Sequence, residues 1–309
     1  MANTVNYAEL WRSDLLEILL DNALTSPFVT SNVNWLGART FHFTQQSVTG
    51  FKDSNRLVNG VQRGDVTQTD VPFTLTHERE VELALHAYDI DESGGSFAPG
   101  GVSETFQRTQ YAPELDAYFY SKVYSIADAA SLTTATAAAS LDKTNVYAYL
   151  KTLLKKTKLR RYRARGSLLA YITSDIMDLL EQSDDFTRKI ELTQVAEGGL
   201  AIETRVTRMD GVPLIEVIDD ERFYTGFDFT TGFVPAVGEF KLNVVIASLE
   251  TTITVPKDDT IFQFAPGEHT KGLGYLYQRF SYMDTFVFPN GADNVIDSIF
   301  CDRDTVAVV

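Results

Sequence analysis

Residues 167–219 constrain the fold of this chain most, because they predict a buried strand, an amphipathic helix and a second buried strand in succession. The run Ser-Leu-Leu-Ala-Tyr-Ile-Thr at 167–173 is short and apolar, which is typical of a buried strand. Ser174 is expected to cap the helix that follows. The apolar face of this helix carries Ile176, Leu179 and Leu180. The segment therefore begins with a strand-helix unit.

The second strand follows a polar segment around Gly198 and Gly199. Asp210 and Gly211 form a dipeptide that marks a tight turn. The strand after this turn carries Val212, Leu214, Ile215, Val217 and Ile218. The segment as a whole is therefore expected to run strand, helix, strand.

Residues 35–82 have a different character and predict a long β-hairpin. The strand-favouring residues of the two arms are Thr40, Phe41, Phe43, Val48 and Thr49, and then Val66, Val71, Phe73, Leu75, Val81 and Leu83. Arms of about 15 residues would project on the order of 50 Å, which is too long for a free two-stranded ribbon in water. Such a hairpin needs a partner surface. The competing interpretation is a hairpin folded back onto its own domain.

Helices are predicted on both sides of the hairpin. Residues 7–23 have helical spacing of their apolar residues, which are Trp11, Leu15, Ile18 and Leu19. Residues 114–130 predict a longer helix with the stripe Leu115, Phe119, Val123 and Ile126. Pro113 stands in its first turn, where a proline is tolerated. If residues 103–111 are also helical, Pro113 would kink one longer rod.

A further helix ends in the chain's strongest run of positive charge. Its apolar face carries Val146, Tyr149, Leu150, Leu153 and Leu154. The charged run consists of Lys151, Lys155, Lys156, Lys158, Arg160, Arg161, Arg163 and Arg165. The run is either a nucleic-acid patch or a solvated helix end that pairs with acidic residues. Only Tyr162 interleaves as an aromatic residue and no recognised nucleic-acid motif surrounds it, so we favour pairing, with the acidic partners on a neighbouring subunit.

The composition excludes several classes of protein. The net charge of -15 and the pI near 4.7 argue against binding nucleic acid through the overall field. Cys301 is the only cysteine, so neither an intrachain disulfide nor a zinc cluster of cysteines can form. The N-terminus lacks the features of a signal peptide, and no apolar run approaches the roughly 20 residues of a membrane span.

No catalytic, cofactor-binding or metal-binding residue is predicted. Residues 89–94 resemble the start of a calcium-binding loop, but its twelfth position is Gly100 where a glutamate is required. His42, His77, His86 and His269 include no pair at the spacing of a zinc helix. A nucleophile elbow, a Walker loop and a dinucleotide fingerprint are all missing from the sequence.

Taken in order, these pieces resemble the HK97-like family of major capsid proteins of tailed bacteriophages, and the resemblance covers nearly the whole chain. It implies an α+β fold of five parts. They are an N-terminal arm at 1–34, an extended hairpin at 35–82, a peripheral domain with a spine helix at 83–142, an axial domain at 143–265, and a return to the peripheral domain at 266–309. The return contains the aromatic strand expected at 275–288.

The resemblance also implies a function. Members of the family are not enzymes; they form pentamers and hexamers of an icosahedral shell around double-stranded DNA. The chain is therefore expected in the virion, assembled in the bacterial host cytoplasm. A separate scaffolding protein and a portal are possible partners, and the expectation includes no cofactor and no membrane. Some members crosslink neighbours through a hairpin lysine and an asparagine, for which Lys52 and Asn290 are the matching residues, although ordinary turn roles are the stronger interpretation.

Three alternatives remain open from the sequence. An encapsulin-like compartment would enclose a cargo enzyme in place of DNA. A soluble acidic hydrolase would need convergent histidine and carboxylate groups, which four scattered histidines do not favour. A tail or other virion component would form tubes or rings.

Overall fold

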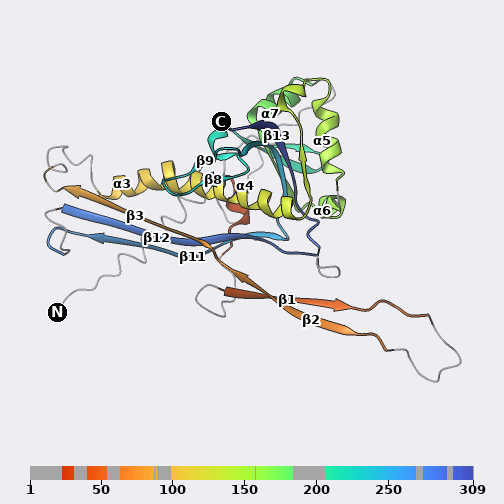
Figure 1. Cartoon of the computed structure of the whole chain (residues 1–309), viewed down its shortest axis with the longest axis horizontal. Helices are drawn as coiled ribbons and strands as arrows, with labels where there is room; N and C mark the ends of the chain where they lie inside the picture. Colours follow the sequence, from red (N-terminus) through yellow and green to blue (C-terminus); the bar gives the residue numbers. More distant parts are fainter. Residues whose placement is uncertain are drawn as a thin grey trace.

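The computed structural model describes residues 23–30, 40–53, 63–86, 88, 99–156, 158–183, 206–268, 274–290 and 295–308 (Figure 1). Two sheets and a projecting hairpin make up much of this part, and a helical rod lies along both sheets. The predicted N-terminal helix at 7–23, the hairpin tip at 54–62 and the glycines at 198–199 lie wholly or mainly outside the described residues.

The larger sheet has six strands in the order β4-β13-β10-β5-β7-β6. These strands are β4 (Thr133–Ala135), β5 (Leu168–Thr173), β6 (Val206–Met209), β7 (Val212–Val217), β10 (Phe240–Ser248) and β13 (Phe300–Ala307). β5 runs parallel to β7, and β13 runs parallel to β4. β10 runs antiparallel to its neighbours β5 and β13, so the sheet is mixed.

Each face of the six-stranded sheet packs into its own core. One face lies against α5 (Val146–Leu154), α6 (Leu159–Arg165) and α7 (Ser174–Glu181). The other face lies against α4 (Ala112–Ala129), where Phe119 and Val123 pack on Tyr171 and Val245. All residues of β5 are buried, as expected for an apolar strand that is covered on both faces.

The strand-helix-strand order predicted for 167–219 is confirmed, with two local corrections. Asp210 (φ 51°) and Gly211 (φ 83°) form the turn between β6 and β7, and positive φ at both residues is the geometry of a tight hairpin turn. Ser174 is not the cap; it is the first residue of α7, and its hydroxyl donates to Glu216 on β7. Ile218 is not in the strand and is 74% exposed, because the pairing of β7 with β5 ends at Val217.

The smaller sheet has three antiparallel strands in the order β11-β12-β3. They are β3 (His77–His86), β11 (Thr252–Phe264) and β12 (Gly274–Val287). β12 is the aromatic strand that the sequence predicts at 275–288, and it occupies the centre of this sheet.

Three strands lie in a different part of the fold from the one expected from their residue numbers. β3 pairs with β12, so residues 77–82 do not belong to the hairpin at 35–82. β11 also lies in the three-stranded sheet, whereas the sequence-based division places it in the axial domain. β13 joins the six-stranded sheet and does not return with β12. The pattern of a strand shows which face is buried, but it does not show which distant strand it pairs with.

The predicted spine helix is confirmed and includes the extension before Pro113. α3 (Pro99–Phe106) continues through a π-helical turn, η2 (Gln107–Tyr111), into α4. A proline ring clashes with the carbonyl four residues earlier, and the widened turn directly before Pro113 relieves such a clash. The middle of the rod packs on Met283 of β12, and its end packs on the six-stranded sheet, so it joins the two sheets.

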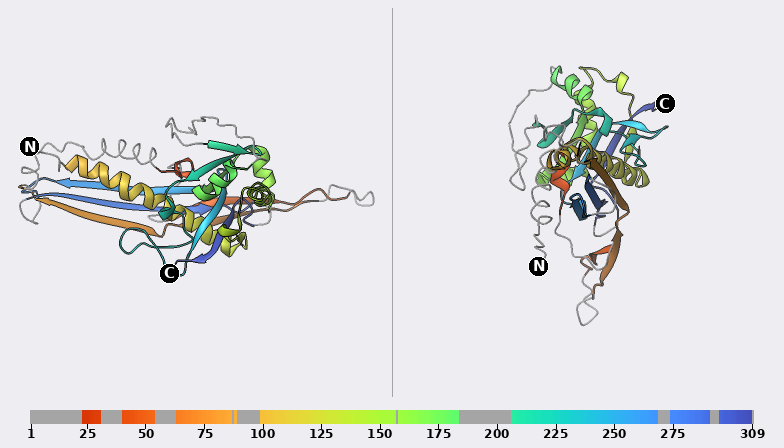
Figure 2. Two further views of the ribbon diagram at one scale, coloured as in Figure 1. Left: turned by 90° about the horizontal axis from the view of Figure 1, so that it is seen from above. Right: turned by 90° about the vertical axis from the view of Figure 1, so that its left-hand side faces the viewer.

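The hairpin consists of β1 (Thr40–Val48) and β2 (Val66–Thr74), paired in register from Thr40↔Thr74 to Val48↔Val66. The nine paired residues of each strand span about 30 Å. The hairpin is shorter than predicted, because the last residues of the expected second arm form β3, which pairs with β12. The hairpin extends beyond both sheets and is not folded back onto its own domain (Figures 1 and 2).

The remaining short elements connect these parts. They are η1 (Ser26–Phe28), η3 (Ala138–Ser140), η4 (Asp220–Arg222), β8 (Phe227–Asp228) and β9 (Val234–Pro235). The single helix predicted to end in the basic run is two helices, α5 and α6. Every cation of the run except Lys151 lies after the end of α5. The predicted apolar face of α5 is correct, since Val146, Leu150, Leu153 and Leu154 are buried.

Candidate assembly surfaces

An aromatic cluster holds the base of the hairpin against the three-stranded sheet. Phe41 of β1 stacks on Phe73 of β2 with ring centroids 5.5 Å apart. Phe286 of β12 meets Phe41 at 5.2 Å and Phe73 at 5.3 Å in edge-to-face geometry, and Phe288 meets Phe73 at 5.3 Å. Such pairs stabilise by about 0.5–1.5 kcal/mol each beyond their buried area. The base of the hairpin is therefore part of the folded body.

The buried carboxylate of Asp284 on β12 fixes the turn through which the hairpin joins β3. Asp284 accepts hydrogen bonds from the backbone N–H and the hydroxyl of Thr76 at 2.9 and 2.8 Å. From α4, the Tyr118 hydroxyl donates at 2.7 Å and the Lys122 ammonium lies at 3.4 Å. Burial, with the nearby charge of Asp284, raises the pKa of Tyr118 above its usual range. These contacts set the direction in which the hairpin leaves the body.

The outer part of the hairpin has no such support. The described residues 48–53 and 63–68 are all exposed, and they include Val48 at 67%, Phe51 at 111% and Val66 at 69%. Thr49 and Asp65 close the paired region, since the Thr49 N–H donates to the Asp65 carbonyl at 3.0 Å. A two-stranded ribbon that covers no apolar face is marginal in water. The outer hairpin therefore has the properties of a surface that a partner completes.

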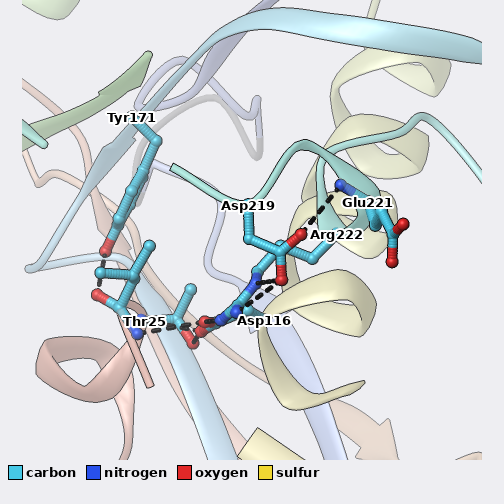
Figure 3. A network of polar contacts seen from close by, with 7 residues as sticks. Thr25, Asp116, Tyr171, Asp219, Glu221 and Arg222 are labelled. Atoms are coloured by element: carbon cyan, nitrogen blue, oxygen red, sulfur yellow. Dashed lines mark hydrogen bonds and ion pairs between the residues drawn. The ribbon is translucent and has the colours of Figure 1, made fainter. Parts of the chain in front are cut away.

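A second buried carboxylate, Asp116 on α4, fixes the described start of the chain (Figure 3). One oxygen accepts from the N–H and the hydroxyl of Thr25 at 3.0 and 2.7 Å. The other accepts from the N–H of Leu24 at 3.1 Å and from Arg222 at 3.0 Å. Arg222 in turn donates to Asp219 at 2.8 Å. Burial raises the pKa of Asp116, and Arg222 with the donors of Thr25 and Leu24 opposes that rise.

This network ties three parts of the fold to residues 24–28, which belong to the expected arm at 1–34. Tyr171 of β5 donates to the carbonyl of Leu24 at 3.0 Å, and Phe28 packs on the rings of Phe119 and Tyr171 at 4.8 and 6.3 Å. The position at which residues 1–22 join the body is thus set by α4, β5 and η4.

The loop between β8 and β9 covers the start of β3. Arg79 pairs with Glu114 of α4 at 2.5 Å and donates to the carbonyls of Phe229 and Gly232. His77 stacks on Tyr118 with centroids 3.8 Å apart. A cavity of about 310 Å³ lies beside these contacts; its described lining contains neither histidine nor cysteine. Among its charged residues, Arg79 and Glu114 pair with each other and Arg279 donates to Gln107.

The remaining residues considered for chemistry are Cys301, the histidines and the calcium-like loop. Cys301 is buried, and burial raises its thiol pKa, which disfavours the reactive thiolate. No cluster of three or more histidine, cysteine, aspartate or glutamate residues that could hold a metal ion occurs in the described ranges. His269 and the calcium-like loop at 89–98 lie outside them. None of the described helices is long and apolar enough to cross a membrane.

The two residues considered for a crosslink have contacts within the subunit. Lys52 donates to the carbonyl of Arg63 across the hairpin at 2.8 Å. Asn290 donates to Asp297 at 3.1 Å and bridges to Val295. Both contacts fit ordinary turn roles, and the absence of a crosslink between neighbours stays a prediction.

The basic run divides into paired and unpaired halves. Lys151 and Arg163 approach Asp210 at 3.9 and 3.4 Å. Lys158 approaches Asp297 at 3.7 Å, and Arg165 pairs with Glu250 at 2.8 Å. For these four cations the acidic partners lie in the same chain, whereas the sequence interpretation placed them on a neighbour. The exposed cations without a carboxylate partner among the described residues are Lys155, Lys156, Arg160 and Arg161.

Sequence reasoning missed the buried carboxylates. Asp284 lies in the aromatic strand β12, and Asp302 lies in the buried first part of β13. Asp302 accepts from Tyr149, Thr134, Thr136 and Asn243. A charged residue within a buried strand was the available signal. Their donors lie far away in sequence, so the partners could not be found without the fold.

The comparisons with known proteins give a likeness of fold. No family model matches the chain, and no curated protein matches it by sequence. Among solved structures it is similar to the mature capsid of bacteriophage PhiM1, with 14% identity, a TM-score of 0.61 and coverage of 92% of this chain and 87% of that one. A structure from Mycobacterium phage Che8 matches with 11% identity, a TM-score of 0.57 and coverage of 91% and 90%. A virus-like particle from Pyrococcus furiosus matches with 12% identity, a TM-score of 0.50 and coverage of 96% and 99%.

Proposed function

We propose that this chain, which has the HK97-like capsid fold, is the major capsid protein of a tailed bacteriophage or prophage. In this role it assembles into pentamers and hexamers of an icosahedral shell that encloses double-stranded DNA. It acts as a structural protein of the virion and not as an enzyme. Fold likeness to phage capsid structures over about nine tenths of the chain supports this proposal.

The observation that carries the proposal is the unsupported outer hairpin. Its base is fixed by the aromatic cluster and Asp284, so its direction is set, yet its exposed apolar residues Val48, Phe51 and Val66 have no cover. A rigidly directed ribbon with an uncovered apolar surface is suited to bind a neighbouring copy, because little conformational entropy is lost on docking. Each contact need not be strong, since many contacts act together in a closed shell.

The expected partners follow from the same role. A separate scaffolding protein and a portal would guide assembly in the host cytoplasm, and the DNA would be enclosed without sequence-specific contacts. The hairpin would serve as the extended loop, the helical rod with the three-stranded sheet as the peripheral domain, and the six-stranded sheet with its helices as the axial domain.

An encapsulin-like compartment is the second candidate, favoured by the fold likeness to the virus-like particle from Pyrococcus furiosus, which covers 96% of this chain. The phage proposal is preferred because phage structures match with higher TM-scores. The contents of purified particles separate the two: double-stranded DNA supports the phage capsid, and a protein cargo supports the compartment.

The test replaces residues 50–64 by Asn-Gly. Thr49 and Asp65 already pair at the end of the ribbon, so a two-residue turn can close it without disturbing its base. The wild-type protein should form closed icosahedral particles in electron microscopy. The shortened variant should fold with an unchanged melting temperature and fail to form shells. Normal shells from this variant would contradict the role given to the hairpin.

The wild-type protein provides the second arm of the test. A small species that persists when candidate scaffold proteins are supplied would reject the capsid function. Boiled, denatured particles should run as a single monomer band, because Lys52 and Asn290 are expected to have ordinary polar roles.

A further inference from the structure

The two ends of the six-stranded sheet carry opposite charge. The pairing registers define these ends: β5, β7 and β13 begin at one end, where β10 finishes, and they finish at the other end, where β10 begins. We call the first the basic end and the second the acidic end. In Figure 1, α6 lies at the basic end, and the C-terminus lies beyond the acidic end of β13.

At the basic end, the described cations outnumber the carboxylates. The eight cations of the basic run lie on α5, on α6 and between them. The acidic residues that face them are Asp210, Glu250 and Asp297, each of which is already paired with members of the run. Lys155, Lys156, Arg160 and Arg161 remain exposed without a carboxylate partner in the described part of the chain. These four residues form the unpaired basic patch.

Two members of the patch are held at positions that the dipole of α6 does not favour. Arg160 and Arg161 occupy the first turn of α6, where positive charge opposes the helix dipole. The helix is fixed by the buried side chains of Leu159 and Tyr162, and the Tyr162 hydroxyl donates to Asp297 at 2.8 Å. Lys156 lies over the ring of Phe300 at 5.9 Å, but the two arginines have no compensating carboxylate among the described residues. A partner outside the subunit is therefore the natural source of compensation.

At the acidic end, carboxylates follow the strands directly. Asp175 comes after β5 and is 77% exposed, and Asp219, Asp220 and Glu221 come after β7. Glu239 precedes β10, and Asp304 lies near the end of β13. The described cations here are Arg222, Lys241 and Arg303, fewer than the six carboxylates. Arg222 pairs with Asp116 and Asp219, and Lys241 pairs with Asp220 at 2.6 Å and with Asp175 at 3.5 Å. This end therefore keeps an excess of negative charge.

We propose that the unpaired basic patch of one copy binds the acidic end of the next copy, head to tail. The inference rests on the proposed shell function. A contact between two different surfaces of the same chain is heterologous, and repeated rotation about one axis closes such contacts into a ring. Charge complementarity fixes the register of the copies and suppresses wrong pairings. In a chain of net charge -15, another copy of the chain is an abundant acidic partner.

Charge reversal tests the proposal. The first variant changes Lys155, Lys156, Arg160 and Arg161 to Glu; it should fold, because acidic residues in the first turn of α6 agree with the helix dipole. The second changes Asp175 and Glu221 to Lys. We expect each variant to lose at least tenfold in the yield of closed particles, measured by sedimentation and electron microscopy. The chain that carries both sets of changes should recover particles, because its two ends are complementary again.

A matched control keeps the charge and changes only the shape. Lys155→Arg, Lys156→Arg, Arg160→Lys and Arg161→Lys together should assemble like the wild type. Wild-type yields from both single-end reversals, or a combined variant that recovers no particles, would overturn the head-to-tail contact while leaving the shell function intact. Normal shells with reduced DNA from the first variant would show that the patch binds DNA, which also overturns the proposal. Failure of the wild type itself to form shells would reject the proposed function and this contact with it.

Discussion

The six-stranded sheet buries its apolar residues within the subunit, whereas the outer hairpin leaves its apolar residues exposed. Strand β5 is buried completely between two helical layers of its own subunit. The outer hairpin keeps its paired backbone but leaves Val48, Phe51 and Val66 exposed. The same kind of residue therefore contributes to folding in one region and is available for association in the other. Stability and assembly should be separable by mutation.

The largest expected effect is in the core between α4 and the sheet. Phe119 is completely buried there and packs on Phe28, Tyr120 and Tyr171. Phe119→Ala removes a large buried ring and leaves a cavity, so the free energy of unfolding should fall by about 3–5 kcal/mol. Urea titration of unassembled subunits measures this loss. An unchanged midpoint would show that this core does not support the fold.

Asp284 lies between the two regions and should show a smaller but still large effect. Asp284→Ala leaves Lys122 without its buried partner and removes the acceptor of Tyr118 and Thr76, so unfolding should become easier by about 3 kcal/mol. Because the carboxylate also fixes the turn after β2, limited proteolysis near residues 75–76 should speed up. Asp284→Asn keeps the shape and one acceptor, and it should lose less. Equal proteolysis rates in Asp284→Ala and the wild type would contradict the positioning role.

The alkaline stability of the sheet should depend on Tyr162. Burial and the bond to Asp297 raise the pKa of Tyr162 to about 12, above its usual value of 10.0. The folded chain holds this proton more tightly than the unfolded chain. The stabilisation is therefore complete below about pH 10 and is lost as the pH rises through 12. Urea midpoints between pH 8 and 12 should fall less steeply in Tyr162→Phe; parallel curves would contradict this assignment.

The smallest effect on folding, and a large one on assembly, is expected at the end of the hairpin. Phe51→Ala makes the same chemical change as Phe119→Ala, but the ring is fully exposed in the subunit. The free energy of unfolding should stay within about 0.5 kcal/mol of the wild type. The yield of closed particles should fall. If Phe51→Ala destabilised the subunit as Phe119→Ala does, the contrast between the two regions would be wrong.

The sequence by itself determined the local elements. Apolar spacing located α4 and α5, the continuous apolar run located β5, and Asp210-Gly211 located the turn before β7. These patterns are periodic over neighbouring residues, so they can be recognised without any knowledge of the fold. The expected capsid-like fold rested on their order, and the likeness to solved phage capsid structures confirms that fold.

Tertiary structure decided which strands pair and which carboxylates are buried. Residues 77–82 pair with β12, about two hundred residues away, and so they do not belong to the hairpin. β13 pairs with β10 and therefore lies in the six-stranded sheet, not in the sheet of β12. Hydrogen-bond partners of Asp116, Asp284 and Asp302 lie 106, 208 and 59 residues away in sequence. A short stretch of sequence shows that a residue is apolar or charged. Only the folded chain determines whether a hydrogen-bond donor reaches a buried carboxylate. The opposite charges at the two ends of the six-stranded sheet arise in the same way, because pairing brings separate loops together.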